Sequence, residues 1–503
     1  MVNNSAILIF ASCFSFLPET RLLVRVASRR EEVGFLAAWR VFDADGNLLP
    51  SQSSAEHLLF LATDLPSVGY RLFWLAPLEL SRRSSPHPSP PLYKGREQEK
   101  PLLIKGFGGV KISAAAQTTV TETRASSDFI FKNQFVAVEI NPETGDIASI
   151  YDRINHRQIF TSTGANQLQA FEDGGQYWDA WNIDPKYAEK PLPPSQLKSI
   201  EWIEQGEIRQ RIRVVRELAG SEFTQDYILD AHSPILRIET SVDWQAEHVL
   251  IKANFPVNLT ADISTSETAC GAIDRPTTPT TTTEQAKWEL PMHRWIDLSD
   301  VSGEYGVSIL NDCKYGYDAG TDYLRLTLLR SSNWPDPTAD RGYHEFSYAI
   351  YPHSGTWQAA QTVRKGLELN SSLQVFRVEG DWDGGIACTE RLALSEVVGV
   401  ASPLAIVSRS GDSVVNKSSN SFIDLQAENL VLMAFKPSEV LDRSWVLRCY
   451  EAQGVEGKIE LTGDLGLEID RVVNILEEPQ PEIVDSTIKP WQIRSFGINQ
   501  NSC

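Results

Sequence analysis

Cysteine, basic charge and long apolar runs are all scarce in this sequence of 503 residues. Its six cysteines form no CxxC pair, which argues against a zinc knuckle or a dense disulfide framework and favours reduced thiols in a cytosol. The 46 Lys and Arg residues are outnumbered by 66 Asp and Glu residues, and the net charge of -20 argues against nucleic acid and anionic membranes as partners. No stretch approaches the roughly 18 apolar residues of a membrane helix. We therefore expect a cytoplasmic protein with neither nucleic-acid nor membrane partners.

The first apolar stretch of the chain has two interpretations. Residues 6–16 read AILIFASCFSF and resemble the core of a signal peptide. However, the preceding MVNNS carries no Lys or Arg, and no convincing cleavage site follows. A buried first strand fits these features better.

Apolar residues alternate with polar ones along most of the chain. In LRIETSVDW (236–244) the apolar side chains share one face of a strand, and IRQRIRVV (208–215) repeats the pattern. Asn141, Pro142 and Gly145 form the turn of a predicted hairpin between FVAVEI and IASIYD. The fold class is therefore mainly β, built of antiparallel β-sandwich domains, with one short helix predicted over 357–369.

Composition divides the chain into four predicted regions. Residues 1–80 form an N-terminal β region, and residues 81–117 form a flexible insertion that begins with a Pro- and Ser-rich segment. Residues 118–370 form a large β-sandwich domain, and residues 371–503 form a C-terminal β-sandwich domain. The insertion is expected to be mobile because it has few residues that could enter a core.

Motifs for a hydrolytic metal site or a nucleophile elbow are missing. The eight histidines form no HxH, HxD or HExxH pattern, and GxSxG, P-loop and GxGxxG motifs do not occur. His344 and His353, with Asp340 and Glu345 nearby, leave a metal site open, although hydrogen-bonded loop histidines fit their spacing better. A glycosidase needs only two correctly spaced carboxyl groups, and the sequence cannot select such a pair from 66 acidic residues.

Tryptophan gives the clearer functional signal, with 13 residues in the chain. YWDAWNIDP (177–185) and the run LLRSSNWPDPTADRGYHEFSYAIYPH (328–353) place aromatic rings beside acidic and basic side chains. Sugars are bound by aromatic faces that stack on C–H patches while carboxylates bind the hydroxyl groups. The alternative is that these rings fill the core between sheets, and the residues alone leave both interpretations open.

Several longer stretches carry a family resemblance. They include FLATDLPSVGYRLFWL (60–75), NQFVAVEINPETGDIASIYDRINHRQIF (133–160), KWELPMHRWIDLSD (287–300) and the 328–353 run. In this order they resemble the C-terminal, all-β portion of glycoside hydrolase family 38 α-mannosidases. The resemblance implies a galactose mutarotase-like super-sandwich and a mannose-containing carbohydrate as partner.

The resemblance also implies what this chain lacks. The family's α/β catalytic domain carries an aspartate nucleophile and a zinc ion held by His and Asp, and its early His-x-Asp signature is absent from this sequence. We therefore expect no catalytic residue, no metal ligand and no cofactor in this chain, with zinc belonging to the family's catalytic domain. That catalytic half would be encoded separately or lost.

Three functions follow as alternatives. The chain takes part in hydrolysis of terminal α-mannosides together with a separate catalytic chain, or it is a carbohydrate-binding module, or it is a structural remnant. By the resemblance, loops of the β domains reach the mannose site. The predicted substrate-binding residues on those loops are Asp179, Trp181, Arg330 and Asp340.

Overall fold

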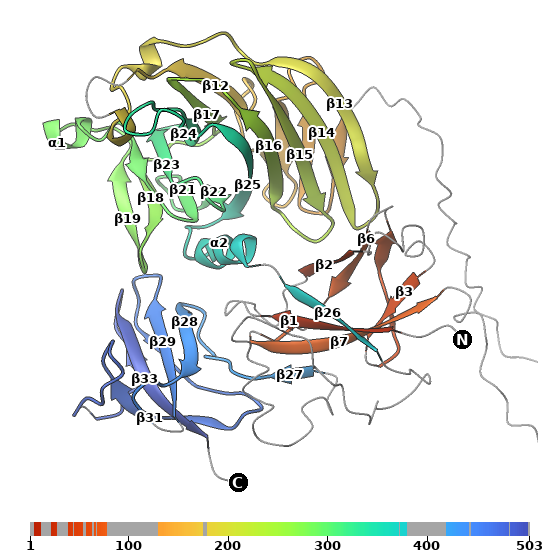
Figure 1. The fold of residues 1–503 in the computed structure, drawn as a ribbon, viewed down its shortest axis with the longest axis vertical. Coiled ribbons are helices and arrows are strands. Elements are labelled where there is room, and N and C mark those ends of the chain that lie inside the picture. The colour runs from red at the N-terminus through yellow and green to blue at the C-terminus, as the bar shows by residue number, and fades with distance from the viewer. Residues whose placement is uncertain are drawn as a thin grey trace, which may run out of the picture.

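The fold is built almost entirely of β-strands, and every strand pair is antiparallel (Figure 1). The computed structural model describes residues 5–11, 22–27, 39–43, 45–53, 57–62, 65–66, 68–77, 129–174, 179–371, 373–379, 419–441, 444–481 and 483–500. The predicted mainly β, antiparallel fold is confirmed. The predicted insertion, residues 81–117, lies outside the described residues.

Three sheets make the large sandwich, which surrounds one continuous apolar core. The nine-stranded sheet runs, in spatial order, β13 (Gln196–Gln205), β14 (Arg209–Leu218), β15 (Ser221–Asp230), β16 (Leu236–Trp244), β25 (Gly342–Ser354), β22 (Tyr305–Asn311), β21 (Trp295–Ser299), β18 (Ile263–Thr268) and β19 (Gly271–Pro276). The five-stranded sheet runs β12 (Gln167–Glu172), β17 (Val249–Pro256), β24 (Tyr323–Arg330), β23 (Gly316–Gly320) and β20 (Leu290–Pro291). The four-stranded sheet runs β11 (Arg157–Gln158), β10 (Ile147–Asp152), β9 (Val136–Ile140) and β8 (Ile130–Lys132).

The two-residue alternation seen in the sequence decides which faces are buried. Leu236, Ile238, Val242 and Trp244 on β16 are all buried in the core. The alternate residues Arg237, Glu239, Ser241 and Asp243 are more exposed, as the period of a strand requires. The hairpin β9–β10 also forms as predicted, and Gly145 adopts a left-handed φ of 75° in its turn.

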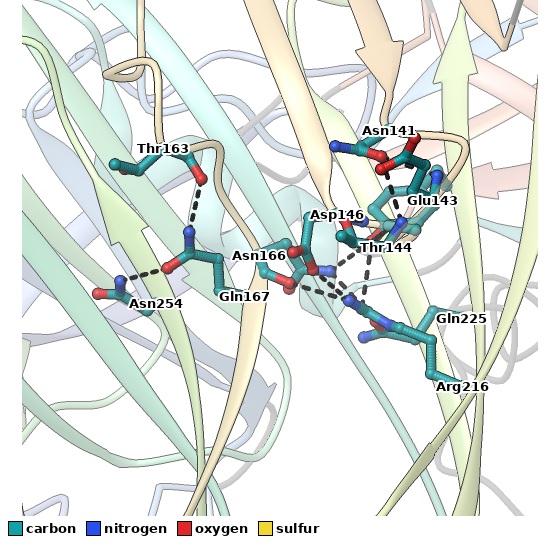
Figure 2. A network of polar contacts seen from close by, with 12 residues as sticks. Asn141, Glu143, Thr144, Asp146, Thr163, Asn166, Gln167, Arg216, Gln225 and Asn254 are labelled. Atoms are coloured by element: carbon teal, nitrogen blue, oxygen red, sulfur yellow. Dashed lines mark hydrogen bonds and ion pairs between the residues drawn. The ribbon is translucent and has the colours of Figure 1, made fainter. Parts of the chain in front are cut away.

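One polar network lies inside this apolar core (Figure 2). Arg216 has no exposed surface, and its Nη1 donates to Asp146 Oδ1 at 2.5 Å. Burial raises the pKa of Asp146, and the Arg216 guanidinium opposes that rise. Asn166 accepts from the Tyr348 hydroxyl group at 2.6 Å and donates to Tyr227 at 2.7 Å. The buried guanidinium of Arg216 is tolerated because it is paired with Asp146 and also donates to the buried Gln225.

The predicted helix over 357–369 begins later than expected. Helix α2 spans Thr362–Asn370, and the preceding residues form turns closed by Ala360 N to Thr356 O at 2.9 Å. Gln361 has a left-handed φ of 57°, which interrupts the helix on its N-terminal side. A second helix, α1 (Thr282–Gln285), closes with a capping box between Thr281 and Glu284 and was not predicted.

The remaining strands lie at the two ends of the chain and pair with one another. The six-stranded sheet contains β26 (Gln374–Glu379), β1 (Ser5–Ala11), β7 (Gly69–Pro77), β3 (Trp39–Phe42) and β4 (Leu48–Leu49), with β27 (Ser419–Ser421) beside β7. A three-stranded sheet holds β2 (Leu22–Ala27), β6 (His57–Ala62) and β5 (Ser51–Ser53). The C-terminal strands are β28 (Leu430–Pro437), β29 (Trp445–Glu451), β33 (Ile493–Gln500) and β31 (Leu467–Val473), with β30 (Gly457–Lys458) paired to β32 (Thr487–Ile488).

The pairing of β1 with β26 joins the first described strand to one near residue 375. Strands from the predicted N-terminal region and from beyond residue 370 therefore share one sheet, which local patterns did not indicate. β1 begins at Ser5 and includes residues 6–11 of the apolar stretch predicted as the first strand. In the described part of the chain, no helix has the length and apolarity needed to cross a membrane.

Candidate functional site

Three connections of the large sandwich meet at one place. They are the segment after β12, which carries the 3-10 helix η4 (Asp179–Trp181), the β16–β17 connection and the β24–β25 connection. His248 N donates to Ser331 O at 2.7 Å, and Asp173 N donates to His248 O at 2.8 Å. Ala180 N donates to Trp334 O at 3.1 Å. Backbone hydrogen bonds thus join the two loops that the sequence singled out, and they add a third.

Arg330, a predicted substrate-binding residue, lies beneath this junction at the end of β24. Its Nε donates to the carboxylate of Asp173, which is buried, and its Nη2 donates to Asn182 O at 2.5 Å. Nη2 also lies 3.7 Å from Asp179 Oδ1. The guanidinium group therefore holds the η4 segment against the sheet and orients Asp179.

Asp179 is the centre of a group of incompletely paired polar atoms. Its Oδ2 accepts from Asn333 N at 2.6 Å and lies 3.7 Å from His248 Nδ1. Within the described residues, Asp179 Oδ1, His248 Nδ1 and Asn333 Oδ1 are buried atoms without a hydrogen-bond partner. Because an unpaired buried polar atom costs about 1–3 kcal/mol, three of them in one place point to a ligand that would pair with them.

Two aromatic rings flank this group. Trp181 is 67% exposed and Trp334 is 49% exposed, and their ring centroids are 5.5 Å apart. The two rings come from different loops and face solvent together. Tyr177 and Trp178, named with Trp181 in the sequence, lie outside the described residues.

Asp340, the fourth predicted residue, makes its contacts at the other end of the β24–β25 connection. Its backbone O contacts His344 Nε2 at 2.7 Å, and its charge acts on Lys314. The neighbouring Arg341 links this end to the junction through Glu247, at 2.5 Å. The hydrogen bond from Asn333 lowers the pKa of Glu247, and Arg341 lowers it further.

Sequence reasoning missed His248 and Asn333. His248 belongs to a connection whose sequence, QAEH, contains no recognisable motif. Asn333 lies in the 328–353 run, but no feature of the sequence distinguishes it from the other polar residues there. Only the approach of three connections in space brings the two side chains to Asp179.

The two histidines that left a metal site open are held by hydrogen bonds in different places. His353 is buried, and its Nε2 contacts both Asp297 Oδ2 at 2.8 Å and Ser308 Oγ at 3.2 Å. Both contacts use one ring nitrogen, whereas a Ser-His-Asp triad uses both nitrogens. Across the described ranges, no three His, Cys, Asp or Glu side chains gather as a metal-binding group.

Family models match two parts of the chain. Residues 131–338 match the glycosyl hydrolases family 38 C-terminal domain, and residues 429–496 match the glycosyl hydrolases family 38 C-terminal beta sandwich domain. The first match includes Asp179, Trp181, His248, Arg330 and Asn333.

Individual relatives agree with the family models. Alpha-mannosidase G of Dictyostelium discoideum is 32% identical over 294 residues, which cover 54% of this chain and 27% of that protein. Alpha-mannosidase 2C1 of Mus musculus is 28% identical over 461 residues, which cover 89% of this chain and 38% of that protein. The chain thus spans about a quarter to two fifths of the length of these relatives.

A solved structure shares the fold of this chain. The crystal structure of an α-mannosidase from Enterococcus faecalis superimposes with a TM-score of 0.66 over 98% of this chain and 56% of that one, at 13% identity. The chain therefore belongs to glycoside hydrolase family 38 and corresponds to the C-terminal portion of its α-mannosidases.

Proposed function

We propose that this chain supplies the glycan-contacting β portion of an α-mannosidase that hydrolyses terminal α-mannosides. The observation that carries the proposal is the group of Asp179 Oδ1, His248 Nδ1 and Asn333 Oδ1, which are buried without a hydrogen-bond partner beside the exposed Trp181 and Trp334. Hydroxyl groups of a sugar would pair with these atoms. Its C–H faces would stack on the two rings.

In this proposal the described residues bind and orient the glycan. Asp179 and Asn333 accept hydrogen bonds from sugar hydroxyl groups, and Arg330 holds the Asp179 carboxylate in place. Asp340 remains a predicted contact for the part of a glycan that extends along the β24–β25 connection. Arg330 and Arg341 at the junction are paired with Asp173 and Glu247.

Bond cleavage in a retaining glycosidase needs a carboxylate nucleophile and an acid/base carboxyl group. We assign both, together with the family's zinc ion, to the α/β catalytic part of the family, supplied by a preceding segment or by a separate chain. We also place the protein in the cytoplasm, a proposal supported by its scattered free thiols, which include Cys270, Cys313 and Cys449.

The experiment combines this chain with a separately expressed family 38 catalytic part and follows hydrolysis of an aryl α-mannoside. We expect hydrolysis only in the mixture. Asp179→Asn and Trp181→Ala should lower its kcat/KM by about 10- to 100-fold, because each loss of a substrate contact costs roughly 1.4–2.8 kcal/mol. Tyr315→Ala, which alters an exposed ring in another loop, is the matched control.

Two results would contradict the proposal in different ways. Normal hydrolysis by this chain alone would show that the catalytic groups lie within it. Restored hydrolysis with unchanged kcat/KM in both variants would show that the junction at Asp179 does not contact the glycan.

A further inference from the structure

A second place where aromatic and polar side chains meet is a cleft between the large sandwich and the C-terminal strands. Its volume is about 540 Å³, which is within the range of ligand pockets. The walls come from β21, β18 and the edge strand β19 of the nine-stranded sheet, from the turn before α2 and from the turn before β33. The principal lining side chains are Asp262, Asp274, Asp297, Asp300, Trp357 and Trp491.

Trp491 is held in this cleft by a buried carboxylate. Its backbone has a left-handed φ of 60°, and its N–H donates to Glu451 Oε2 at 3.0 Å. Glu451 has no exposed surface and also accepts from the backbone N–H groups of Gln453 and Gly454, each at 2.8 Å. Trp491 is 43% exposed, and its ring lies 6.5 Å, centroid to centroid, from that of the buried Trp357. A strained turn thus presents an aromatic face to the cleft.

The four carboxylates that line the cleft are not equally available. Asp297 is buried and accepts from Ser299 and Ser308, each at 2.7 Å, and contacts His353 at 2.8 Å. Asp300 accepts from Ser302 Oγ at 2.7 Å within its own turn. Asp262 and Asp274 are exposed, and Asp274 uses only Oδ1, which accepts from Thr265 at 2.7 Å. These two residues supply the free acceptors.

The rest of the lining favours a polyhydroxylated ligand. Thr356 and Gln358 also line the cleft and can donate as well as accept hydrogen bonds. No Lys, Arg or His is among the lining residues, which disfavours an anion. A metal ion is also disfavoured, because the described residues contain no group of three suitable ligands.

We propose that this cleft binds a neutral oligosaccharide, with one sugar ring stacked on Trp491 and its hydroxyl groups bonded to Asp262 and Asp274. The site shares no residue with the junction at Asp179 and does not depend on the function proposed above. An organic amine could also use carboxylates and aromatic rings, but it would leave the donors of Thr356 and Gln358 without a role.

Calorimetric titration of the full chain with α-mannobiose and with cellobiose tests the proposal. The measurements use the Trp181→Ala variant as background, so that sugar binding at the junction at Asp179 does not contribute to the signal. We expect saturable binding of at least one disaccharide with a Kd of about 1 mM or below. Asp262→Asn should weaken it several-fold.

Two substitutions at one position separate the ring from the fold. Trp491→Gly removes the ring but suits the left-handed backbone, and it should weaken binding by about tenfold or more. Trp491→Phe keeps an aromatic face and should retain most of the binding. Absence of binding to both disaccharides would overturn the proposal, as would equal affinity in Trp491→Gly. Salt-sensitive binding of spermidine that requires Trp491, without disaccharide binding, would identify an amine site instead.

Discussion

Arg330 and Asp173 form an ion pair across 157 positions of the sequence, with Arg330 Nε donating to Asp173 Oδ2. The Asp173 side chain has no exposed surface, and that of Arg330 is 13% exposed. The second oxygen of Asp173 accepts from Asp184 N at 2.7 Å. One buried carboxylate therefore fixes both ends of the segment that carries Asp179 and Trp181.

Removing the guanidinium should cost much of the stability of the sandwich. Arg330→Ala leaves Asp173 charged and buried without its partner, a change that typically lowers the free energy of unfolding by about 3–5 kcal/mol. Arg341→Ala removes an ion pair whose Glu247 is half exposed and should cost about 1 kcal/mol or less. Urea unfolding of both variants measures the difference. Equal losses would mean that the Arg330–Asp173 pair contributes no more than a surface pair.

Two hairpin glycines allow strain and crowding to be separated. Gly145 has a φ of 75°, and a Cβ atom there would lie 2.4 Å from Val214 Cγ1. Gly220 has a φ of 77° with nothing within 4 Å of the same position. Gly220→Ala should cost about 1 kcal/mol from backbone strain alone. Gly145→Ala should cost about 1–3 kcal/mol more, because the core must move. Similar midpoints in thermal unfolding would contradict this ranking.

Local sequence patterns predicted the strands well because their cause is local. The alternation over 236–244 follows from one buried face, and the turn at Gly145 follows from its own residues. The start of α2 was predicted five residues too early, since the left-handed Gln361 interrupts a run whose composition suits a helix. The pairing of β1 with β26 has no local cause and could not be predicted.

The sequence likewise predicted some residues of the candidate site and missed others. Asp179 and Trp181 were found because they are neighbours in the sequence and combine a carboxylate with an aromatic ring. His248 and Asn333 were missed because they reach Asp179 only through backbone contacts between separate connections. Arg330 was found as a charged residue in the right run, but its pairing with the distant Asp173 could not be read from that run.

The stability of the fold should depend on pH through Asp184, which follows Asp179 and Trp181 in the segment after β12. The hydrogen bond from Lys190, at 2.6 Å, lowers the pKa of this buried carboxyl group, and the N–H of Lys186 adds to the effect. A lowered pKa contributes stability above the usual value of 3.8 and loses it as the pH falls through the folded-state value. Wild type should therefore exceed Asp184→Asn in stability at pH 7, and the gap should close below about pH 4. A gap that is independent of pH would contradict this assignment.

Lys252 holds the outer face of the five-stranded sheet together. It is fully buried, and its Nζ donates to Glu289 at 2.5 Å, to Asp318 at 2.8 Å and to Thr327 at 2.9 Å. Asp318 also accepts from the hydroxyl group of Tyr187, in the 3-10 helix η5 (Tyr187–Glu189), at 3.0 Å. Lys252 is thereby connected to the segment that carries Trp181.

Lys252→Met should lower the free energy of unfolding by about 3–5 kcal/mol, because Glu289 loses its cation and Asp318 keeps only Arg325, at 2.7 Å. Burial already raises the pKa of Glu289, and Lys252 opposes that rise, so the variant should recover part of its stability on acidification. Adding Glu289→Gln should recover part of it at pH 7. Lys287→Met, at an exposed position, should change stability by less than about 0.5 kcal/mol. If the Lys252 variant unfolds at the same urea concentration as the Lys287 variant, the buried amine does not stabilise this face of the sheet.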